Sequence, residues 1–278
     1  MLVDTSNSFI RKILEKTYTI AEIGINHGGD IELAKKLIES ASRTGCDAVK
    51  FQTYITEARA PKGNKEIFEI LKNCELQFDS FGILKSYAES LGLDFFSTPF
   101  DEQSIDYLES IDVEIYKVAS FDIVNTKLLK KLALTQKPLI ISTGMSDISE
   151  IKNALSLVEK SPIILLHCVS AYPTEEHDAN LNSIKVLEEN FPSCLIGQSD
   201  HTNSIKVPLF AVSMGAKVIE KHYKINEAMD CIDSPVSITE NQMKEMVQEI
   251  RNLEKIMGDF VVQDSEAQSS SHIFRRES

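Results

Sequence analysis

The sequence predicts an α/β protein whose main domain is a closed (β/α)8 barrel, the TIM-barrel architecture. Short apolar segments rich in β-branched residues recur eight times, alternating with amphipathic helical patterns. This alternation favours parallel pairing of the strands with right-handed crossovers. The competing architecture is a doubly wound open sheet, which usually has a glycine-rich phosphate loop after its first strand. Residues 24–29 lack the G-x-G-x-x-G pattern of that loop, so the barrel is favoured.

The expected strands are short and mostly apolar, as a parallel sheet covered by helices requires. They span residues 18–24, 48–53, 94–98, 114–120, 138–143, 163–168, 194–199 and 217–222. The expected helices span residues 31–42, 81–91, 102–110, 126–134, 149–160, 181–189, 204–214 and 239–257. Eight such units in about 240 residues fit the usual size of this barrel.

Two longer connections follow strands at the carboxyl-end face, where such barrels keep their active sites. Residues 55–76 follow the second strand and carry additional helical pattern, and residues 223–237 follow the eighth strand. We expect three segments in the chain: an N-terminal extension over 1–16, the barrel over 17–258, and a polar, serine-rich tail or linker over 259–278.

The charge and composition restrict the classes of partner. The formal net charge is −13 and the pI is about 5.0, so the surface repels nucleic-acid backbones and anionic lipid. The first residues have no long apolar segment typical of a signal peptide, and no apolar run is long enough to span a bilayer. Five cysteines without a C-x-x-C pair are typical of reduced thiols. We therefore expect a cytoplasmic protein that binds neither nucleic acid nor membrane.

Every predicted strand ends in polar residues, and these ends meet on one face of a barrel. Alternate residues of a strand share a side, so Lys50 and Gln52 point the same way along the second strand. Lys117 lies near the end of the fourth strand. Two lysines on different strands, beside serine and threonine residues, favour a phosphate or carboxylate ligand over two structural ion pairs. Lys221 has the opposite parity, and we expect it on the helix side.

Two histidines end neighbouring strands. Neutral imidazoles of His201 and His222, with Glu22 nearby in a closed ring, could share a divalent metal. Two imidazoles with an oxygen ligand fit manganese or magnesium better than structural zinc, which prefers a complete set of nitrogen and sulfur ligands. The alternative is that His201 is incidental, beside a helix cap formed by Asp200 or Thr202.

The polar strand ends also form a set of motifs that stand in a familiar order. They read AEIGINH (21–27), VKFQT (49–53), FSTPF (96–100), YKVAS (116–120), STGM (142–145), LHC with YPT (166–168 and 172–174), SDHT (199–202) and EKH (220–222). From about residue 17 to 258, the chain resembles the catalytic barrel of the sialic-acid synthase family, which includes N-acetylneuraminate, legionaminate and pseudaminate synthases. Each motif alone has low specificity, but eight in register are specific.

The resemblance implies condensation of phosphoenolpyruvate with an N-acylated hexosamine, such as N-acetylmannosamine or a diacetamido-trideoxyhexose. The products are a nine-carbon 2-keto sugar acid and phosphate. It implies that His201 and His222 hold Mn²⁺ or Mg²⁺, which polarises the sugar aldehyde. It implies catalytic roles for Glu22, as acid or base, and for Lys50 and Lys117, in the phosphoenolpyruvate site. The remaining substrate contacts that it implies are Gln52, Thr98, Ser120, Asp122, Ser142, Ser170, Tyr172, Ser199 and Asp233.

The chain departs from the family pattern at several points. Ser170 stands where asparagine is common, Asp122 stands where glutamate is common, and Cys231-Ile232 precede Asp233 in place of Gly-Pro. Family members usually continue into an antifreeze-like domain, which in a swapped dimer supplies an arginine to the partner's sugar site. We expect this C-terminal domain to be absent, by nature or by truncation. A homodimer and a separate chain that supplies the domain both stay open, as do the sugar and the metal.

Two other functions stay open from the sequence. One is a barrel aldolase or lyase that acts on another phosphorylated substrate, with Lys50 or Lys117 as a Schiff-base nucleophile. The other is a non-catalytic or impaired barrel, which predicts weak binding of metal and phosphoenolpyruvate. The presence of both lysines and both histidines favours the synthase over this second alternative.

Overall fold

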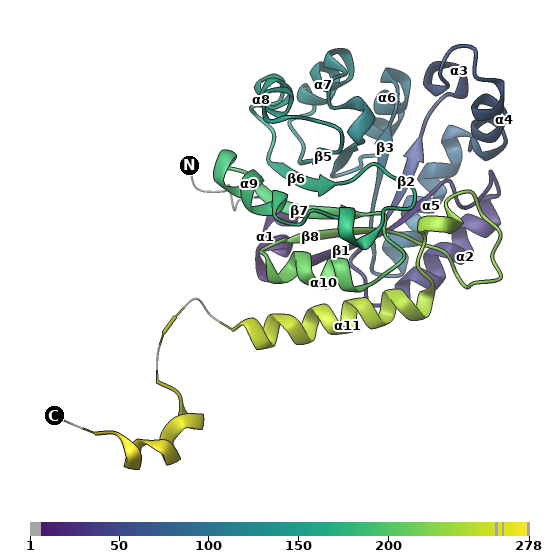
Figure 1. Cartoon of the computed structure of the whole chain (residues 1–278). Helices are drawn as coiled ribbons and strands as arrows, with labels where there is room; N and C mark the ends of the chain where they lie inside the picture. Colours follow the sequence, from purple (N-terminus) through teal and green to yellow (C-terminus); the bar gives the residue numbers. More distant parts are fainter. Residues whose placement is uncertain (1–6, 259–260, 263, 277–278) are drawn as a thin grey trace.

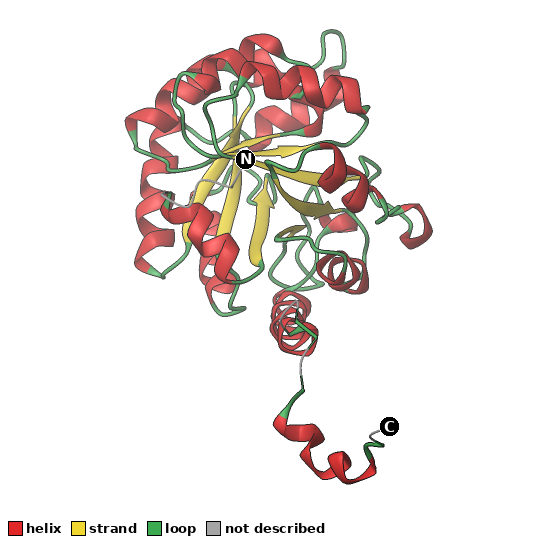
Figure 2. Ribbon diagram, turned by 90° about the vertical axis from the view of Figure 1, so that its left-hand side faces the viewer, coloured by secondary structure: helices red, strands yellow, loops and turns green. Residues whose placement is uncertain are grey.

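The computed structural model describes residues 7–258, 261–262 and 264–276, and its centre is a closed barrel of parallel strands in sequence order. The strands are β1 (Tyr18–Gly24), β2 (Ala48–Thr53), β3 (Asp94–Pro99), β4 (Tyr116–Val118), β5 (Leu139–Ser142), β6 (Ile163–Cys168), β7 (Leu195–Asp200) and β8 (Val218–His222). β8 pairs with β1 and so closes the barrel. The predicted (β/α)8 barrel is confirmed, and Figures 1 and 2 show the helices surrounding the strands.

The helices that cover the barrel begin at polar caps. Asp30 accepts hydrogen bonds from two backbone amides of the first turn, and Asp147 and Thr239 each form a capping box. The covering helices are α2 (Ile31–Ser42), α5 (Phe78–Ser90), α6 (Glu102–Ser110), α7 (Thr126–Ala133), α8 (Ile148–Leu157), α9 (Ser183–Asn190), α10 (Lys206–Ser213) and α11 (Glu240–Met257). Their predicted ranges agree to within a few residues at each end. The fourth strand is shorter than predicted at both ends: it begins at Tyr116, and after Val118 the chain turns into a 3₁₀ helix, η1 (Ser120–Asp122).

Two layers of apolar side chains hold the barrel together. The outer layer lies between strands and helices, and the inner layer fills the amino end of the barrel. Helix α1 (Ser8–Glu15) closes that end, because its Phe9, Ile10 and Ile13 join the inner layer and are almost fully buried. Burial of three such side chains contributes roughly 1.5–3 kcal/mol each. The sequence analysis did not identify this helix.

The two inserts lie at the opposite, carboxyl end of the strands. The first contains α3 (Thr56–Arg59) and α4 (Lys65–Cys74), and the second contains the short turn η3 (Ser234–Val236). A further short turn, η2 (Glu176–Asp178), precedes α9. Figure 1 shows η4 (Glu266–Phe274) apart from the barrel, and the described residues after Gly258 are exposed. Within the described ranges, we find no helix with the length and apolar character needed to cross a membrane.

Candidate active site

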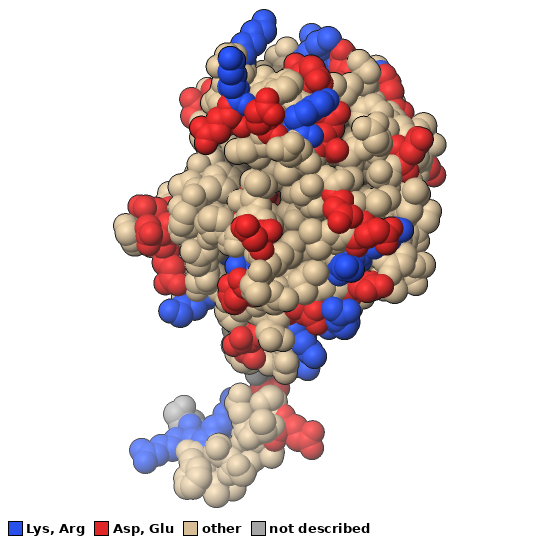
Figure 3. Space-filling view, turned by 90° about the vertical axis from the view of Figure 1, so that its right-hand side faces the viewer, with Lys and Arg blue, Asp and Glu red and all other residues tan. Residues whose placement is uncertain are grey.

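A cavity of about 190 Å³ opens at the carboxyl ends of the strands. Figure 3 looks onto this side of the molecule, where the largely uncharged centre of the face is hollowed and most charged side chains lie nearer its edge. The cavity is lined by Glu22, Ile25, Lys50, Gln52, Arg59, Thr98, Phe100, Lys117, Ala119, Ser120, Phe121, Ser142, Cys168, Tyr172, Ser199, His201, Glu220, His222 and Asp233. It therefore collects side chains from every part of the ring of strands.

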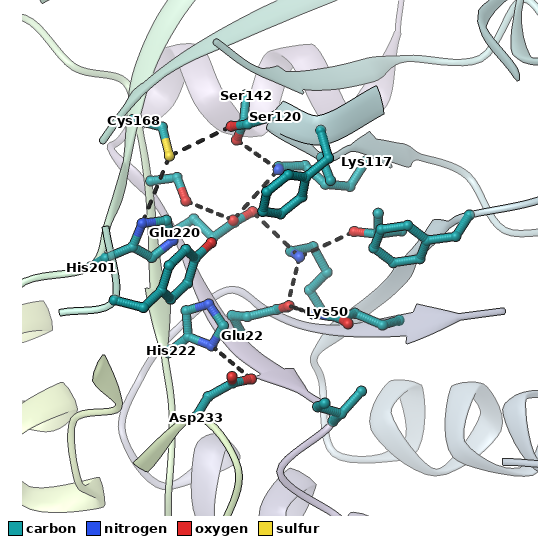
Figure 4. Close-up of a pocket in the computed structure, with 18 of the residues that line it drawn as sticks. Glu22, Lys50, Lys117, Ser120, Ser142, Cys168, His201, Glu220, His222 and Asp233 are labelled. Carbon is teal, nitrogen blue, oxygen red and sulfur yellow. Dashed lines mark hydrogen bonds and ion pairs between the residues drawn. The ribbon is translucent and has the colours of Figure 1, made fainter. Parts of the chain in front are cut away.

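Strand register determines which of these groups meet. Glu22 of β1 is the register partner of Lys50 in β2 and of His222 in β8. Two positions before His222 on β8, Glu220 points to the same side of the sheet. The ring of the barrel thus brings a carboxylate, an ammonium and an imidazole from three neighbouring strands to one wall of the cavity (Figure 4).

Two lysines and two glutamates form a buried ionic cluster at the bottom of the cavity. Lys50 Nζ is 2.7 Å from Glu22 Oε2 and 3.8 Å from Glu220 Oε2, and Lys117 Nζ is 3.6 Å from Glu220 Oε1. All four side chains are 5% exposed or less. Hydroxyl and amide groups complete the cluster, since Lys50 donates to Thr98, Lys117 to Ser142, Ser199 to Glu220, and Gln52 to Glu22.

The two glutamates have opposite protonation tendencies. Burial acts to raise the pKa of Glu220, but Lys117 and Lys50 outweigh it and lower this pKa to about 2. Burial raises the pKa of Glu22, and the attraction of Lys50 and His222 does not offset it. Carboxylates whose pKa values are pushed apart are suited to different roles in acid–base chemistry. Glu220 is suited to hold a fixed negative charge, and Glu22 is suited to exchange a proton.

The two histidines lie side by side next to this cluster, since His222 is the register partner of Glu22. Their ring centroids are 5.5 Å apart, and Tyr172 stacks against His201 at 4.1 Å. The Nδ1 of His201 is 2.7 Å from the carbonyl oxygen of Val169, which can only accept a hydrogen bond. The proton of His201 is therefore on Nδ1 when the ring is neutral, and Nε2 keeps a lone pair. Burial and the neighbouring His222 lower the pKa of His201 to about 3, so it is neutral at pH 7.

The two imidazoles are the candidate donors for the divalent metal ion that the sequence predicts. Besides the two imidazoles, Asp233 Oδ2 lies 3.5 Å from His222 Nδ1. Burial lowers the pKa of His222, but Asp233 outweighs it and raises this pKa. Within the described ranges, no group of three or more His, Cys, Asp and Glu side chains is arranged as a metal site. Two imidazoles alone leave coordination positions for oxygen atoms of substrate and water, as hard divalent ions require.

The second insert places Asp233 at the cavity. Asn26 accepts a hydrogen bond from the backbone amide of Asp233, at 2.9 Å, and donates to Ser237 and to the carbonyl oxygen of Tyr223. Ser237 in turn donates to the carbonyl oxygen of Asp233, at 2.7 Å. These contacts fix the loop that carries Asp233 on the end of β1.

The predicted site residues lie around this cavity, with two exceptions. Asp122 and Ser170 are not among the lining residues. Asp122 accepts a hydrogen bond from Asn125. Ser170 lines a neighbouring cavity, beside Met145, and its buried hydroxyl has no hydrogen-bond partner within the described ranges. The roles of both residues stay predictions.

Several lining residues were not in the predicted set. The parity of Glu220 with His222 was visible in the sequence, but the pairing of Glu220 with both lysines required the barrel geometry. Cys168 was expected to be a core residue; it is buried, but it also lines the cavity. Arg59 is on the first insert, and Phe100, which follows β3, packs against it. The sequence pattern of the insert predicts a helix, but it does not predict that the insert lies at the cavity.

A parallel barrel with a polar cavity at the carboxyl ends of its strands is the arrangement of TIM-barrel enzymes. The profile of the NeuB family matches residues 37–262. The chain therefore belongs to the NeuB family.

Individual relatives agree with this assignment. An uncharacterized protein of Methanocaldococcus jannaschii is 45% identical over 247 residues, which are 88% of this chain and 73% of that protein. The N,N'-diacetyllegionaminic acid synthase of Legionella pneumophila is 40% identical, over 87% of this chain and 73% of that protein. The crystal structure of an N-acetylneuraminic acid (sialic acid) synthetase from Leptospira borgpetersenii, in complex with citrate, superimposes with a TM-score of 0.90 at 38% identity. That match covers 94% of this chain and 91% of that chain.

Proposed function

We propose that the chain condenses phosphoenolpyruvate with an N-acylated hexosamine to give a nine-carbon 2-keto sugar acid and phosphate. The main support is the presence in one cavity of two buried lysines and a pair of histidines with ring centroids 5.5 Å apart. The lysines provide positive charge for an anionic donor, and the histidines provide a place for the acceptor's oxygen near a divalent ion. Family membership and the legionaminic acid synthase among the relatives support the same reaction class.

The lysine end of the cavity is the proposed phosphoenolpyruvate site. Lys50 and Lys117 hold the phosphate and carboxylate groups, together with hydroxyl groups of Thr98, Ser120, Ser142 and Ser199. A charge-assisted hydrogen bond from a fixed ammonium orients the donor as well as binding it. Glu220, whose pKa is about 2, keeps both lysines protonated and in position.

The histidine end is the proposed acceptor site, with Gln52, Tyr172 and Asp233 as sugar contacts. His201 and His222 would hold Mn²⁺ or Mg²⁺, and the bound ion would supply Lewis-acid polarisation of the sugar aldehyde oxygen. Carbon 3 of phosphoenolpyruvate forms a bond to the aldehyde carbon. Positive charge then develops at carbon 2, water adds there, and phosphate leaves from the tetrahedral intermediate. Glu22 has a raised pKa and exchanges the proton of the sugar oxygen.

The test is to incubate the protein with phosphoenolpyruvate, Mn²⁺ and a panel of N-acylated hexosamines, and to follow phosphate release and formation of a 2-keto acid. We expect release with a member of the panel, loss of release after chelation, and recovery when Mn²⁺ is added back. His201→Ala and His222→Ala should abolish release while leaving the fold intact by circular dichroism. Absence of both release and phosphoenolpyruvate binding would contradict the synthase assignment and favour a non-catalytic barrel.

One observation favours a second candidate, an aldolase that forms a Schiff base. Burial lowers the pKa of Lys117, and a lysine with a lowered pKa is a better nucleophile. Borohydride added with a carbonyl substrate would trap an aldolase covalently at Lys117, and mass spectrometry would detect the adduct. We expect no adduct, because Lys117 is paired with Glu220 and donates to Ser142.

A further inference from the structure

Arg59, at the end of α3, is unlike the other two cationic side chains of the cavity. Lys50 and Lys117 each have a carboxylate partner within 4 Å. Arg59 lines the same cavity, but its Nη1 atom is buried and has no hydrogen-bond partner in the described part of the chain. A buried donor without a partner lowers stability by about 1–3 kcal/mol. Such a donor at a cavity wall is suited to pair with a ligand atom.

Aromatic side chains hold the guanidinium of Arg59 in place. Its central carbon is 3.8 Å from the ring centroid of Phe100 and 4.4 Å from that of Tyr54. The Tyr54 hydroxyl donates to the carbonyl oxygen of Leu71 at 2.9 Å, which anchors this ring to α4. Stacked guanidinium groups present their N–H edge to an acceptor, and a group fixed before binding loses little conformational entropy.

The surroundings of Arg59 distinguish between possible acceptors. Burial lowers the pKa of Arg59, and the carboxylates of Asp233, Asp122 and Glu22 act in the opposite direction. These carboxylates would repel an additional anion at this end of the cavity. A neutral carbonyl oxygen meets no such repulsion. The neighbouring cavity wall is apolar, because Ile25 and Phe100 line it and belong with Tyr54 to one hydrophobic cluster.

A ligand that suits both Arg59 and the apolar wall has a carbonyl oxygen next to a small apolar group. An amide with a short acyl chain has these two features. We propose that Arg59, Ile25 and Phe100 form the subsite for an N-acyl group of the acceptor sugar. In this subsite the Nη1–H of Arg59 donates to the acyl oxygen, and the acyl methyl group packs against Ile25 and Phe100. This inference rests on the proposed function for its sugar but concerns a residue on the first insert, outside the two lysines and two histidines.

The subsite predicts a specific form of discrimination. An acceptor without the acyl group leaves Nη1 buried and unpaired, whereas an acylated acceptor satisfies it. Arg59→Met should therefore lower kcat/KM for N-acetylmannosamine about 10- to 100-fold. The same substitution should leave the KM for phosphoenolpyruvate and the kcat/KM for mannose, which has a hydroxyl in place of the acylamino group, within about twofold. Arg59→Lys should recover only part of the loss, because an ammonium lacks the planar fork.

The experiment measures phosphate release for wild type, Arg59→Met and Arg59→Lys with both sugars. Arg11→Met serves as a matched control, since Arg11 is exposed on α1 at the opposite end of the barrel. Equal losses for N-acetylmannosamine and mannose, or a raised KM for phosphoenolpyruvate, would overturn the proposal and assign Arg59 to the fold or to the donor site.

A binding measurement separates this inference from the proposed reaction. Calorimetric titration of N-acetylmannosamine into wild type and Arg59→Met needs no turnover. Weaker binding to the variant, with no phosphate release from either protein, would support the acyl subsite while removing the synthase assignment. Equal affinity of the two proteins, or absence of binding to wild type, would overturn the acyl subsite.

Discussion

Two regions of the barrel bury lysine–carboxylate pairs, and they differ in whether the charged groups face the active-site cavity. Between β8 and its covering helices, Lys221 is fully buried, and its ammonium donates to Asp200 and to the carbonyl oxygen of Thr202. The Thr202 hydroxyl donates to the same carboxylate. The residues of this Lys221 cluster do not line the active-site cavity.

The second region is the cluster of Lys50, Lys117, Glu22 and Glu220 inside the barrel. Here Glu22 Oε2 pairs with Lys50 at 2.7 Å, whereas Glu220 Oε2 has no hydrogen-bond partner in the described structure, and the cluster faces the cavity. The two regions meet at consecutive residues of β8, because Glu220 points into the barrel and Lys221 points out of it. A buried charge whose partners are all supplied by the fold stabilises the fold. A buried charge that faces a cavity is available to a ligand.

Lys50→Met gives the largest expected effect on function and the sharpest test of this comparison. Removal of a preorganised charged donor from an active site lowers turnover by about 10³-fold. We expect a loss of that size in phosphate release and loss of phosphoenolpyruvate binding by calorimetry. Stability should fall less than in Lys221→Met, because Glu22, with its raised pKa, can take up a proton when Lys50 is gone. A melting temperature reduced as much as in Lys221→Met would refute the distinction between the regions.

Lys221→Met should have the opposite result. It leaves the buried carboxylate of Asp200 unpaired, so the free energy of unfolding should fall by about 3–5 kcal/mol. Activity per folded molecule should change little. Urea unfolding measures the first quantity, and phosphate release below the transition measures the second. The matched control adds Asp200→Asn to Lys221→Met, which removes the unpaired charge and should restore part of the stability. No recovery in the double variant would mean that lost packing, rather than lost charge pairing, explains the effect.

His27 extends the comparison to a buried group without a charged partner. Burial lowers the pKa of this imidazole from 6.5 to about 4, and the side chain is 1% exposed. Since the pKa is lower in the folded state, the stabilisation is fully present above pH 6.5 and is lost as the pH falls toward 4. Between pH 7 and pH 4, the free energy of unfolding should fall by about 3 kcal/mol more in wild type than in His27→Gln. Denaturation curves with parallel pH dependence for both proteins would show that His27 does not take part in acid unfolding.

The sequence predicted those parts of the molecule that follow from local pattern. Alternation of strands and helices gave the barrel, and the two-residue period of β-strands placed Lys50 inside and Lys221 outside. Both outcomes are seen in the ion pairs of the structure. Because strand ends of a parallel barrel converge, motifs at those ends were enough to bring the two histidines together.

The parts that the sequence did not predict depend on contacts between distant segments. Helix α1 has only eight residues, and its amphipathic pattern predicts a packed helix only once the open amino end of the barrel is known. Arg59 enters the cavity because the first insert packs its Tyr54 on α4 and lies against Phe100, and neither contact is local. Asp122, which the sequence analysis expected to contact substrate, accepts a hydrogen bond from Asn125 and is not among the residues that line the cavity.

Two glycines allow the comparison to be tested with the smallest chemical change, one methyl group. A Cβ atom on Gly197, in β7, would lie 2.4 Å from the carbonyl oxygen of Val218 and 2.7 Å from Leu166. A Cβ atom on Gly144, after β5, would lie 2.4 Å from the Ser170 hydroxyl and 2.8 Å from that of Ser120. The first clash is with the barrel wall, and the second is with side chains at the proposed donor site.

We expect Gly197→Ala to lower the free energy of unfolding by about 1–3 kcal/mol, because the backbone of β8 cannot move without disturbing its pairing with β1. Gly144→Ala should be milder in stability, since a serine can rotate away, but should weaken phosphoenolpyruvate binding about 10-fold, through loss of the Ser120 hydroxyl. Urea unfolding and calorimetry on both variants provide the two readouts. If Gly144→Ala binds phosphoenolpyruvate normally, Ser120 does not contact this substrate. The phosphoenolpyruvate site is then confined to the lysines and their immediate hydrogen-bond partners.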